Sequence, residues 1–367
     1  MKIGIITYHR SYNYGALLQA TALREFLSER GHNVYFVDYW PAHNKHRYSV
    51  FSFTWMIKTQ RGIKKKIKYV ISCISNFNYR KKRNKCFQDY ISEYILPYLL
   101  PVSESFDIVI HGSDQIWRKQ PEIDRYNPVY FGKHDIKTKL KISYAASMGI
   151  VPQNDMEKNM LRKYVSYLDV VSVREKDLQD FLFDLGFSNI KLVVDPTLLL
   201  DCSHWTDLFK IKKTDEEPYL LYYKLQNSFD ENEVRKFADA MKLKIKIISG
   251  RYRNKSENGL SAVNPKDFVE VIANSSYIFT SSFHGLVFSL LYHKPFLASF
   301  TNSSARAISL LSEIGLSTRL IKPCSIFTQV AYQKIDYDQV DINLHSLREK
   351  SIKFLMDICV SLDKHIN

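Results

Sequence analysis

A short stretch in the last third of the chain carries the residue types best suited to chemistry. It reads TSSFHGLVFSLL, residues 280–291, and places two serines, a histidine and a glycine between a strand-like run and a run with helical apolar spacing. A helix start exposes unpaired backbone N–H groups, so an anion fits there beside Ser281, Ser282 and Gly285. His284 would face that anion as an acid or a base, unless it only caps the turn.

The turn after the first predicted strand follows the same logic. It reads HRSYNYGALLQA, residues 9–20, and begins with polar side chains that include Arg10. Asn13 could cap the following helix, and Gly15 would let the backbone approach a ligand closely. Capping alone is the alternative interpretation. The GxGxxG spacing of a dinucleotide-binding turn is missing, so the pattern does not support NAD or FAD.

The stretch HGSDQIW, residues 111–117, combines polar side chains with an aromatic ring behind another predicted strand. Ser113, Asp114 and Gln115 precede Trp117. Because a sugar ring presents both C–H patches and hydroxyls, an aromatic face beside such groups suits a carbohydrate. A polar loop with one packed tryptophan fits the same residues equally well.

Arg174 stands at the end of the apolar run VSVRE. It could pair with Glu175 or Asp177 at the surface, the commoner outcome for a lone arginine. It could also present its planar guanidinium to a carboxylate or phosphate, a task that suits arginine better than lysine. The sequence leaves both interpretations open.

The elements that must position these residues alternate between strand-like runs and helical periods, which predicts parallel sheets covered by helices. The predicted strands are residues 2–9, 33–40, 107–112, 141–147, 169–175, 190–196, 219–225, 244–250, 276–280 and 294–300. The predicted helices are residues 16–30, 176–185, 230–241, 265–273 and 346–362.

The polar stretch TDEEP, residues 214–218, is the best boundary signal, because the alternation starts afresh after it. We therefore expect an α/β protein with two Rossmann-like domains. The predicted parts are an N-terminal domain at 1–200 with a basic insertion at about 42–98, a second domain at 215–342, and a helix within 343–367 that packs on either domain.

Composition favours a globular chain. Its 367 residues are 45% hydrophobic, and the first apolar run ends too early for a signal peptide, so a cytoplasmic protein is expected. Its five cysteines are scattered and form no CxxC pair, which disfavours disulfides and a structural zinc. We expect no metal.

Charge is concentrated in one segment. The chain carries 52 lysines and arginines against 38 acids, and the excess lies largely in residues 58–85, which contain KTQRGIKKKIKYV and YRKKRNK. A solvated helix face is one interpretation, and an anionic surface or substrate is the other. No nucleic-acid-binding module is recognisable, so we expect no nucleic acid partner.

Taken together, the polar residues after these strands and the motifs around them resemble those of the polysaccharide pyruvyl transferase family. The similarity spans roughly residues 1–300, and a weaker similarity follows at residues 305–319. Its five ordered motifs are KIGIITYHRSYNYGALLQATALREFL, FDIVIHGSDQIW, VVSVREKDLQDFL, VVDPTLLLD followed by Trp205, and SSYIFTSSFHGLVFSLLYHKPFLA.

The resemblance implies a GT-B-like architecture, with two Rossmann-like domains and the active site in the cleft between them. It implies transfer of an enolpyruvyl-derived group from phosphoenolpyruvate to two hydroxyls of a glycan sugar, which forms a pyruvate ketal in bacterial capsule or exopolysaccharide biosynthesis. No cofactor is needed. The acceptor would be linked to a polyprenyl diphosphate, and the basic segment would contact the inner membrane face peripherally.

Carried over to this chain, the resemblance assigns two catalytic residues, His284 as the acid and Arg174 as a cation. The implied donor-binding residues are Ser281, Ser282, Gly285, Lys224, Lys294 and Arg306. The implied acceptor-binding residues are Arg10, Asn13, Tyr14, Gly15, Ser113, Asp114, Gln115 and Trp117.

One position departs from the family pattern. Some members carry an arginine two positions before the histidine, whereas this chain has Ser282 there. The missing cation would then have to come from elsewhere in the chain, or donor binding would rely on Ser281, Ser282 and the helix amides. The candidates are Lys224, Lys294, Arg251 and Arg306.

Two other functions fit the same pattern. A GT-B glycosyltransferase would use a nucleotide sugar and need an acidic residue for the ribose, for which Glu313 is the nominee. A non-catalytic glycan-assembly protein would keep the fold without the chemistry.

Overall fold

The computed structural model describes residues 1–41, 48–60, 62–120, 125–249, 259–260, 262–301, 305–325 and 327–366. Within them, parallel sheets alternate with helices, so the α/β class predicted from the sequence is confirmed. Arg251, one of the candidate cations, lies outside the described residues.

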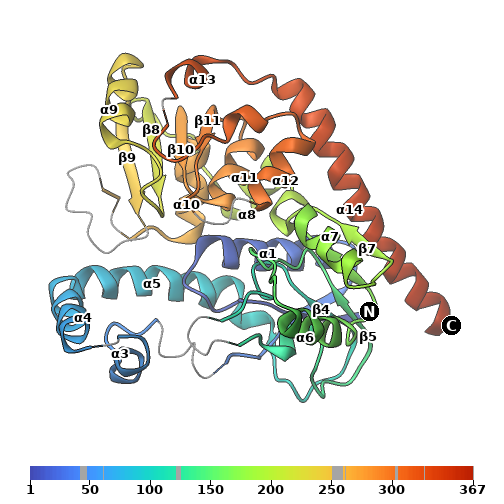
Figure 1. The fold of residues 1–367 in the computed structure, drawn as a ribbon. Coiled ribbons are helices and arrows are strands. Elements are labelled where there is room, and N and C mark those ends of the chain that lie inside the picture. The colour runs from blue at the N-terminus through green and yellow to red at the C-terminus, as the bar shows by residue number, and fades with distance from the viewer. Residues whose placement is uncertain are drawn as a thin grey trace.

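The first half of the chain, in which Figure 1 labels β4 and β5, is built on a parallel sheet with the strand order β3-β2-β1-β4-β5. Strand β6 continues this sheet beside β5 through isolated bridges and pairs with β7. Most positions of β1 and β4 are buried, as their nearly continuous apolar runs require. The strands are β1 (Lys2–Ile6), β2 (Asn33–Val37), β3 (Leu99–Leu100), β4 (Phe106–His111), β5 (Thr138–Ser143), β6 (Val171–Val173) and β7 (Ile190–Leu192).

Helix α1 (Tyr14–Ser28) lies between the two halves of the molecule, which explains why thirteen of its fifteen residues are buried. Asn13 caps it, because its side chain accepts a hydrogen bond from the Ala16 N–H at 3.2 Å. The other helices of this half are α6 (Asp155–Val165), α7 (Lys176–Asp184) and α8 (Cys202–Phe209).

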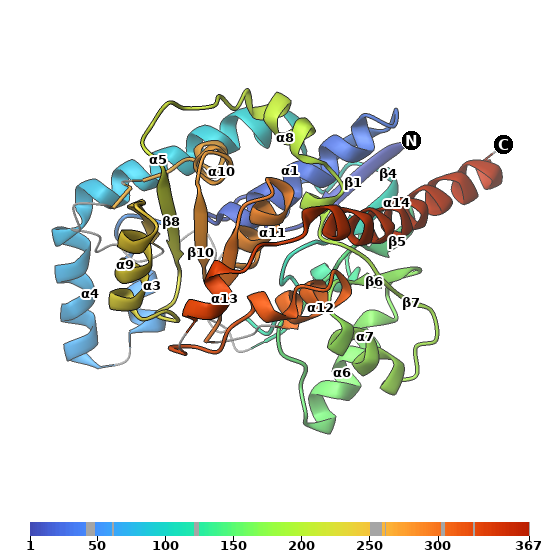
Figure 2. The same cartoon turned by 90° about the horizontal axis from the view of Figure 1, so that it is seen from above.

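An insertion of three helices separates β2 from β3. Figure 2 shows it as a protruding arm, with α5 leading back toward α1. It falls within the basic insertion expected from the sequence. Its helices are α3 (Phe53–Thr59), α4 (Ile63–Ser75) and α5 (Phe77–Tyr94).

The second half contains a parallel sheet with the strand order β11-β10-β8-β9. Its strands are β8 (Tyr219–Lys224), β9 (Lys244–Ser249), β10 (Tyr277–Thr280) and β11 (Phe296–Ala298). Its helices are α9 (Glu231–Ala240), α10 (Pro265–Ala273), α11 (Phe283–Leu291), α12 (Ala305–Glu313) and α13 (Thr328–Tyr332).

The long final helix α14 (Tyr337–Ile366) begins earlier than the predicted 346–362 and contacts both halves. Near its start, the Tyr337 hydroxyl donates to the Lys294 carbonyl at 2.6 Å. Further along, the Ser351 hydroxyl accepts from the Val194 N–H at 3.0 Å. None of the described helices is long and apolar enough to cross a bilayer.

One apolar core joins the two sheets. Helix α1 packs on α10 and α11, and the Tyr14 ring stacks on Phe268 with centroids 4.6 Å apart. The two halves therefore meet through a continuous hydrophobic contact, which holds their facing sheet edges in position.

Candidate active site

A cavity of about 640 Å³ lies between the two halves. Its walls come from segments that follow β1, β4 and β5 on one side and β8, β10 and β11 on the other. The carboxyl ends of parallel strands meet at one edge of a sheet. Both sheets therefore present the turns that carry polar and charged side chains to the same space. The cleft expected between the two halves is present.

Two helices begin at this cavity. Asn13 caps α1 and Ser282 caps α11, and both residues line the space. The Ser282 hydroxyl accepts from the Gly285 N–H at 3.4 Å. Converging helix starts give the cavity a positive potential, which favours an anionic ligand.

His284 lies in the first turn of α11 and is 5% exposed. Its ring packs directly on Gly15, where a Cβ atom would come within 1.9 Å of Nδ1. Only glycine leaves room for the imidazole there. The alternative that His284 caps the turn is wrong, because Ser282 provides the cap.

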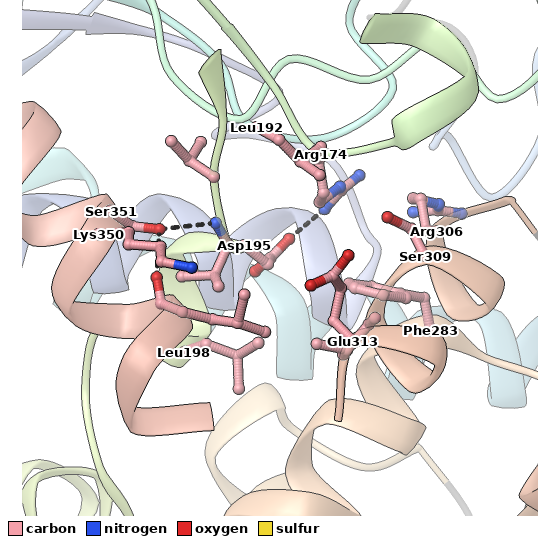
Figure 3. Close-up of a pocket in the computed structure, with 14 residues that line it drawn as sticks. Arg174, Leu192, Asp195, Leu198, Phe283, Arg306, Ser309, Glu313, Lys350 and Ser351 are labelled. Atoms are coloured by element: carbon pink, nitrogen blue, oxygen red, sulfur yellow. Dashed lines mark hydrogen bonds and ion pairs between the residues drawn. The ribbon is translucent and has the colours of Figure 1, made fainter. Parts of the chain in front are cut away.

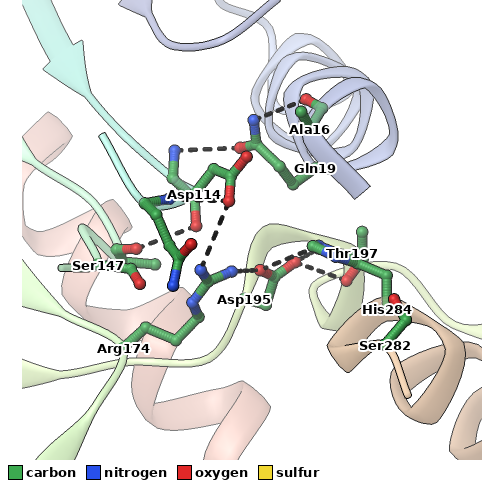
Figure 4. Close-up of polar contacts among 12 residues, drawn as sticks. Ala16, Gln19, Asp114, Ser147, Arg174, Asp195, Thr197, Ser282 and His284 are labelled. Atoms are coloured by element: carbon green, nitrogen blue, oxygen red, sulfur yellow. Dashed lines mark hydrogen bonds and ion pairs between the residues drawn. The ribbon is translucent and has the colours of Figure 1, made fainter. Parts of the chain in front are cut away.

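Asp195 holds the other side of the imidazole (Figure 4). Its Oδ2 lies 3.5 Å from His284 Nε2 and also accepts from Arg174, while Oδ1 accepts from the Thr197 hydroxyl at 2.6 Å. Burial alone would raise the pKa of Asp195, but the Arg174 guanidinium and His284 outweigh it and lower that pKa. Asp195 is therefore a carboxylate, and it forms an ion pair with His284 when the imidazole is protonated.

The remaining ring nitrogen of His284 is free for a ligand. Neither ring nitrogen forms a hydrogen bond with a described residue, although Nε2 lies 3.5 Å from Asp195 Oδ2, and the ring lies in the cavity wall. An imidazole with one nitrogen beside a buried carboxylate and the other without a hydrogen-bond partner can transfer a proton in a set direction.

Arg174 is buried behind the pair formed by His284 and Asp195, called here the dyad. Its side chain is 2% exposed, binds Asp195, and approaches Asp114 Oδ1 at 4.0 Å (Figure 4). It pairs with neither Glu175 nor Asp177, and it is absent from the cavity wall. The surface pairing with Glu175 or Asp177 is therefore wrong, and the guanidinium instead binds a carboxylate, that of the buried Asp195 after β7.

Arg306, in the first turn of α12, is the described candidate for the missing cation that lines the cavity. Its guanidinium carbon lies 5.2 Å from the Phe283 ring centroid, and Arg174 lies 5.0 Å from the same ring. Burial and the charge of Arg174 lower the pKa of Arg306 to about 10, which leaves it cationic at neutral pH. No described residue forms an ion pair or hydrogen bond with it.

The other described candidates for the missing cation lie elsewhere. Lys224 forms an ion pair with Glu231 and is absent from the cavity wall. Lys294 directly precedes β11 and therefore lies at the amino end of the sheet, opposite the cavity. A crossover helix always returns the chain to that end, so the prediction for Lys294 is wrong.

Behind the dyad is a second, smaller pocket of about 60 Å³ (Figure 3). Arg174, Asp195 and Arg306 form part of its wall together with Glu313. Glu313, the nominee for a ribose contact, is thus in this pocket and does not line the large cavity.

On the acceptor side, the structure brings Asn13, Asp114 and Gln115 into the cavity wall. The prediction that Trp117 binds the acceptor is wrong. Its ring is fully buried, it stacks on Phe131 at 4.9 Å, and its indole N–H donates to a backbone carbonyl. Of the two interpretations of this loop, the packed tryptophan is the right one.

Three other predicted acceptor residues have structural partners instead. The Tyr14 hydroxyl donates to the Val263 carbonyl at 3.0 Å. Arg10 forms an ion pair with Asp38 at 2.9 Å. The fully buried Ser113 hydroxyl donates to a carbonyl at 3.0 Å. None of them lines the cavity.

Two of the predicted donor residues shape the turn. The Ser281 hydroxyl accepts from the N–H groups of Leu225 and Gln226, at 2.8 and 3.1 Å, and so ties the β8 turn to the β10 turn. At Gly285, a Cβ atom would come within 2.2 Å of the Thr280 hydroxyl. Glycine is therefore required for the close packing of α11 on its strand.

Sequence reasoning missed three side chains of this region. Asp195 lies in the predicted strand 190–196 and received no role, although its place after an apolar run was a usable signal. Arg118 and Lys119 line the cavity just beyond Trp117. Within the described residues, no group of three histidine, cysteine or acidic side chains is placed to hold a metal ion.

Comparison with known proteins adds a family and structures of similar fold. The UDP-GlcNAc 2-epimerase of Neisseria meningitidis, bound to UDP-GlcNAc, is 10% identical with a TM-score of 0.49, over 98% of this chain and 99% of that chain. The E. coli heptosyltransferase WaaC with ADP is 9% identical with a TM-score of 0.40, over 95% and 100%. No curated protein sequence matches. The family model for polysaccharide pyruvyl transferase matches residues 13–304, and the chain belongs to that family.

Proposed function

We propose that this transferase moves the enolpyruvyl-derived group of phosphoenolpyruvate onto two hydroxyls of a sugar, which forms a pyruvate ketal and releases phosphate. The observation that carries the proposal is the unpaired Arg306 beside His284 and the start of α11, in one cavity. Phosphoenolpyruvate presents a phosphate and a carboxylate. A cation and a helix start are suited to binding these two anionic groups.

In the proposed reaction His284 is the acid. Its Nδ1 gives a proton to the methylene carbon, which becomes a methyl group and leaves C2 electron-deficient. One sugar hydroxyl attacks C2, the C2–O bond to phosphate breaks with its electron pair, and the second hydroxyl closes the ketal. Of the two hydroxyl protons, one restores His284 and the other leaves on phosphate.

Asp195 and Arg174 are positioning residues in this scheme. Asp195 Oδ2 lies 3.5 Å from Nε2, so it would pair with the protonated imidazole and direct the donated proton to Nδ1, while Arg174 keeps Asp195 ionised. Arg306 and the N–H groups of α11 would stabilise the negative charge that grows on the departing phosphate.

The acceptor would enter from the N-terminal side of the cavity, where Asp114 and Gln115 offer polar groups to sugar hydroxyls. Arg118 is exposed at the same wall and suits a diphosphate. This fits a glycan on a polyprenyl diphosphate, in capsule or exopolysaccharide biosynthesis, as the acceptor we propose.

The direct test is phosphate release. We expect purified protein to release phosphate from phosphoenolpyruvate only when an acceptor glycan is present, and the acceptor to gain one pyruvate ketal in its mass spectrum. Phosphoenolpyruvate should also raise the melting temperature. Stabilisation by UDP- or GDP-sugars without phosphate release would contradict the proposal and favour a glycosyltransferase.

Replacing Arg306 tests its role as the donor cation. Because a hydrogen bond to a charged group contributes about 1.5–3 kcal/mol, Arg306→Met should lower kcat/KM for phosphoenolpyruvate roughly 10- to 100-fold. The matched control is Arg235→Met, at an exposed arginine on α9. Equal kcat/KM values for the two variants would show that Arg306 does not bind the donor.

A further inference from the structure

Helix α4 presents a row of isoleucines to solvent. Ile63, Ile67, Ile71 and Ile74 are 77%, 54%, 57% and 73% exposed. Residues three and four apart share a helix face, so these four form one stripe, called here the isoleucine face. Four exposed isoleucines on a helix of thirteen residues are far more than isolated surface apolar residues would explain.

The isoleucine face is not the side by which α4 packs on the protein. Cys73, on another side of the helix, is 3% exposed. Tyr69 also faces inward, since its hydroxyl accepts from the Ser52 N–H at 3.3 Å and its ring lies 6.0 Å from Phe51. The helix thus has a packed side of its own, and the isoleucine face remains uncovered in the described chain.

The neighbouring helices of the insertion also carry exposed apolar residues. Phe53 and Ile57 of α3 are 62% and 51% exposed, and Phe77 at the start of α5 is 52% exposed. Figures 1 and 2 both place α4 at the outer edge of the molecule, away from the two sheets. The surface therefore projects outward and is accessible to a large flat partner.

The surrounding charge identifies the partner. Residues 39–88 contain thirteen lysines and arginines and no aspartate or glutamate. Lys64, Lys65 and Lys68 are exposed on α4 itself. Apolar side chains on one face with lysines beside them are typical of helices that lie in the headgroup region of anionic membranes.

We propose that α4 binds an anionic lipid bilayer, with the isoleucine face inserted at the acyl boundary and the lysines on the headgroups. Lysines fit this partner because protein–protein interfaces are depleted of lysine. Nucleic acid fits less well because a phosphate backbone would leave the isoleucines in water.

The position of α4 links this surface to the active site. The insertion leaves the sheet at the carboxyl end of β2, the same edge that carries the cavity turns. Helix α5 is tied to that edge, because Arg83 donates to the Tyr12 carbonyl at 3.0 Å, next to Asn13 in the cavity wall. A bilayer bound at α4 would thus deliver a lipid-linked acceptor to the cavity, a consequence that rests on the proposed function.

Vesicle co-sedimentation of the full chain tests the proposal. We expect binding to vesicles that contain an anionic phospholipid, weaker binding to zwitterionic vesicles, and a further decrease with salt. The double variant Ile67→Asp/Ile74→Asp should lower partitioning about tenfold or more. The matched control is Ile342→Asp, at an isoleucine of α14 that is 64% exposed, and it should bind like the wild type.

Three results would overturn the proposal. The first is absence of binding to anionic vesicles by the wild type. The second is equal binding by the double variant and the control, which would leave only non-specific charge attraction. The third is a dimer in solution that the double variant dissociates, because a second copy would then cover the isoleucine face.

Phosphate release with a water-soluble acceptor separates this proposal from the proposed function. The double variant should keep that activity and its melting temperature, since α4 lies outside the cavity wall. Loss of vesicle binding with normal turnover supports the membrane contact. An inactive wild type that still binds vesicles contradicts the proposed function alone.

Discussion

His284→Gln is expected to lower kcat by about 10²–10⁴-fold, because glutamine has no proton that it can give to carbon at neutral pH. Its side chain is of similar length and can lie over Gly15 without the clash that a larger residue would cause. Phosphoenolpyruvate should therefore still raise the melting temperature of the variant. Phosphate release and thermal shift, measured on the same preparation, separate the two effects.

A second histidine on the same segment gives the control. His293 follows α11 at its far end, is paired with Asp341 at 3.0 Å, and is away from the cavity. His293→Gln should leave kcat unchanged. If His284→Gln retained wild-type turnover, His284 would not be the acid, and the dyad with Asp195 would be structural.

Asp195→Ala is expected to lower the free energy of unfolding by about 3–5 kcal/mol, because it leaves the Arg174 guanidinium buried with only the more distant Asp114 carboxylate, at 4.0 Å, to compensate it. Both side chains are almost fully buried, so solvent screens this loss little. Urea denaturation measures the change. The double variant Arg174→Met/Asp195→Ala should recover part of the stability but not the turnover, since the imidazole would remain without its carboxylate. A loss below about 1 kcal/mol in Asp195→Ala would contradict the buried pair.

The contribution of Asp195 also has a predicted pH dependence. The fold lowers the pKa of this carboxyl below its ordinary value of about 3.9. A depressed carboxyl pKa adds stability that is complete above the ordinary pKa and is lost as the pH falls toward the folded one. The stability difference between wild type and Asp195→Asn should thus be constant near neutral pH and shrink below about pH 4.

Periodicity was sufficient for most elements, because parallel strands buried on both faces need continuous apolar runs and their covering helices need a 3.6-residue period. The helix predicted at 265–273 coincides with α10. The final helix was too short in the prediction, since α14 lies across two halves and its burial pattern is mixed. Local patterns carry less information where an element packs on two different surfaces.

Ligands of open parallel sheets bind beyond the carboxyl ends of the strands, and this rule also located much of the cavity from the sequence. His284, Asn13 and Gln115 follow three different strands, and the parallel sheets bring them to one space. The rule could not tell which side chains of a turn face outward. Trp117 was therefore open between two interpretations until its burial against Phe131 was known.

The sequence by itself determined the α/β class, the family motifs and the histidine at the start of α11. Tertiary structure alone decided the partners: Asp195 lies beside His284, Arg174 keeps Asp195 charged, and Arg306 lines the same cavity as Ser282. The physical reason is that strand and helix formation depend on local apolar spacing. The charge of a buried site depends on which distant side chains share the same low-dielectric space.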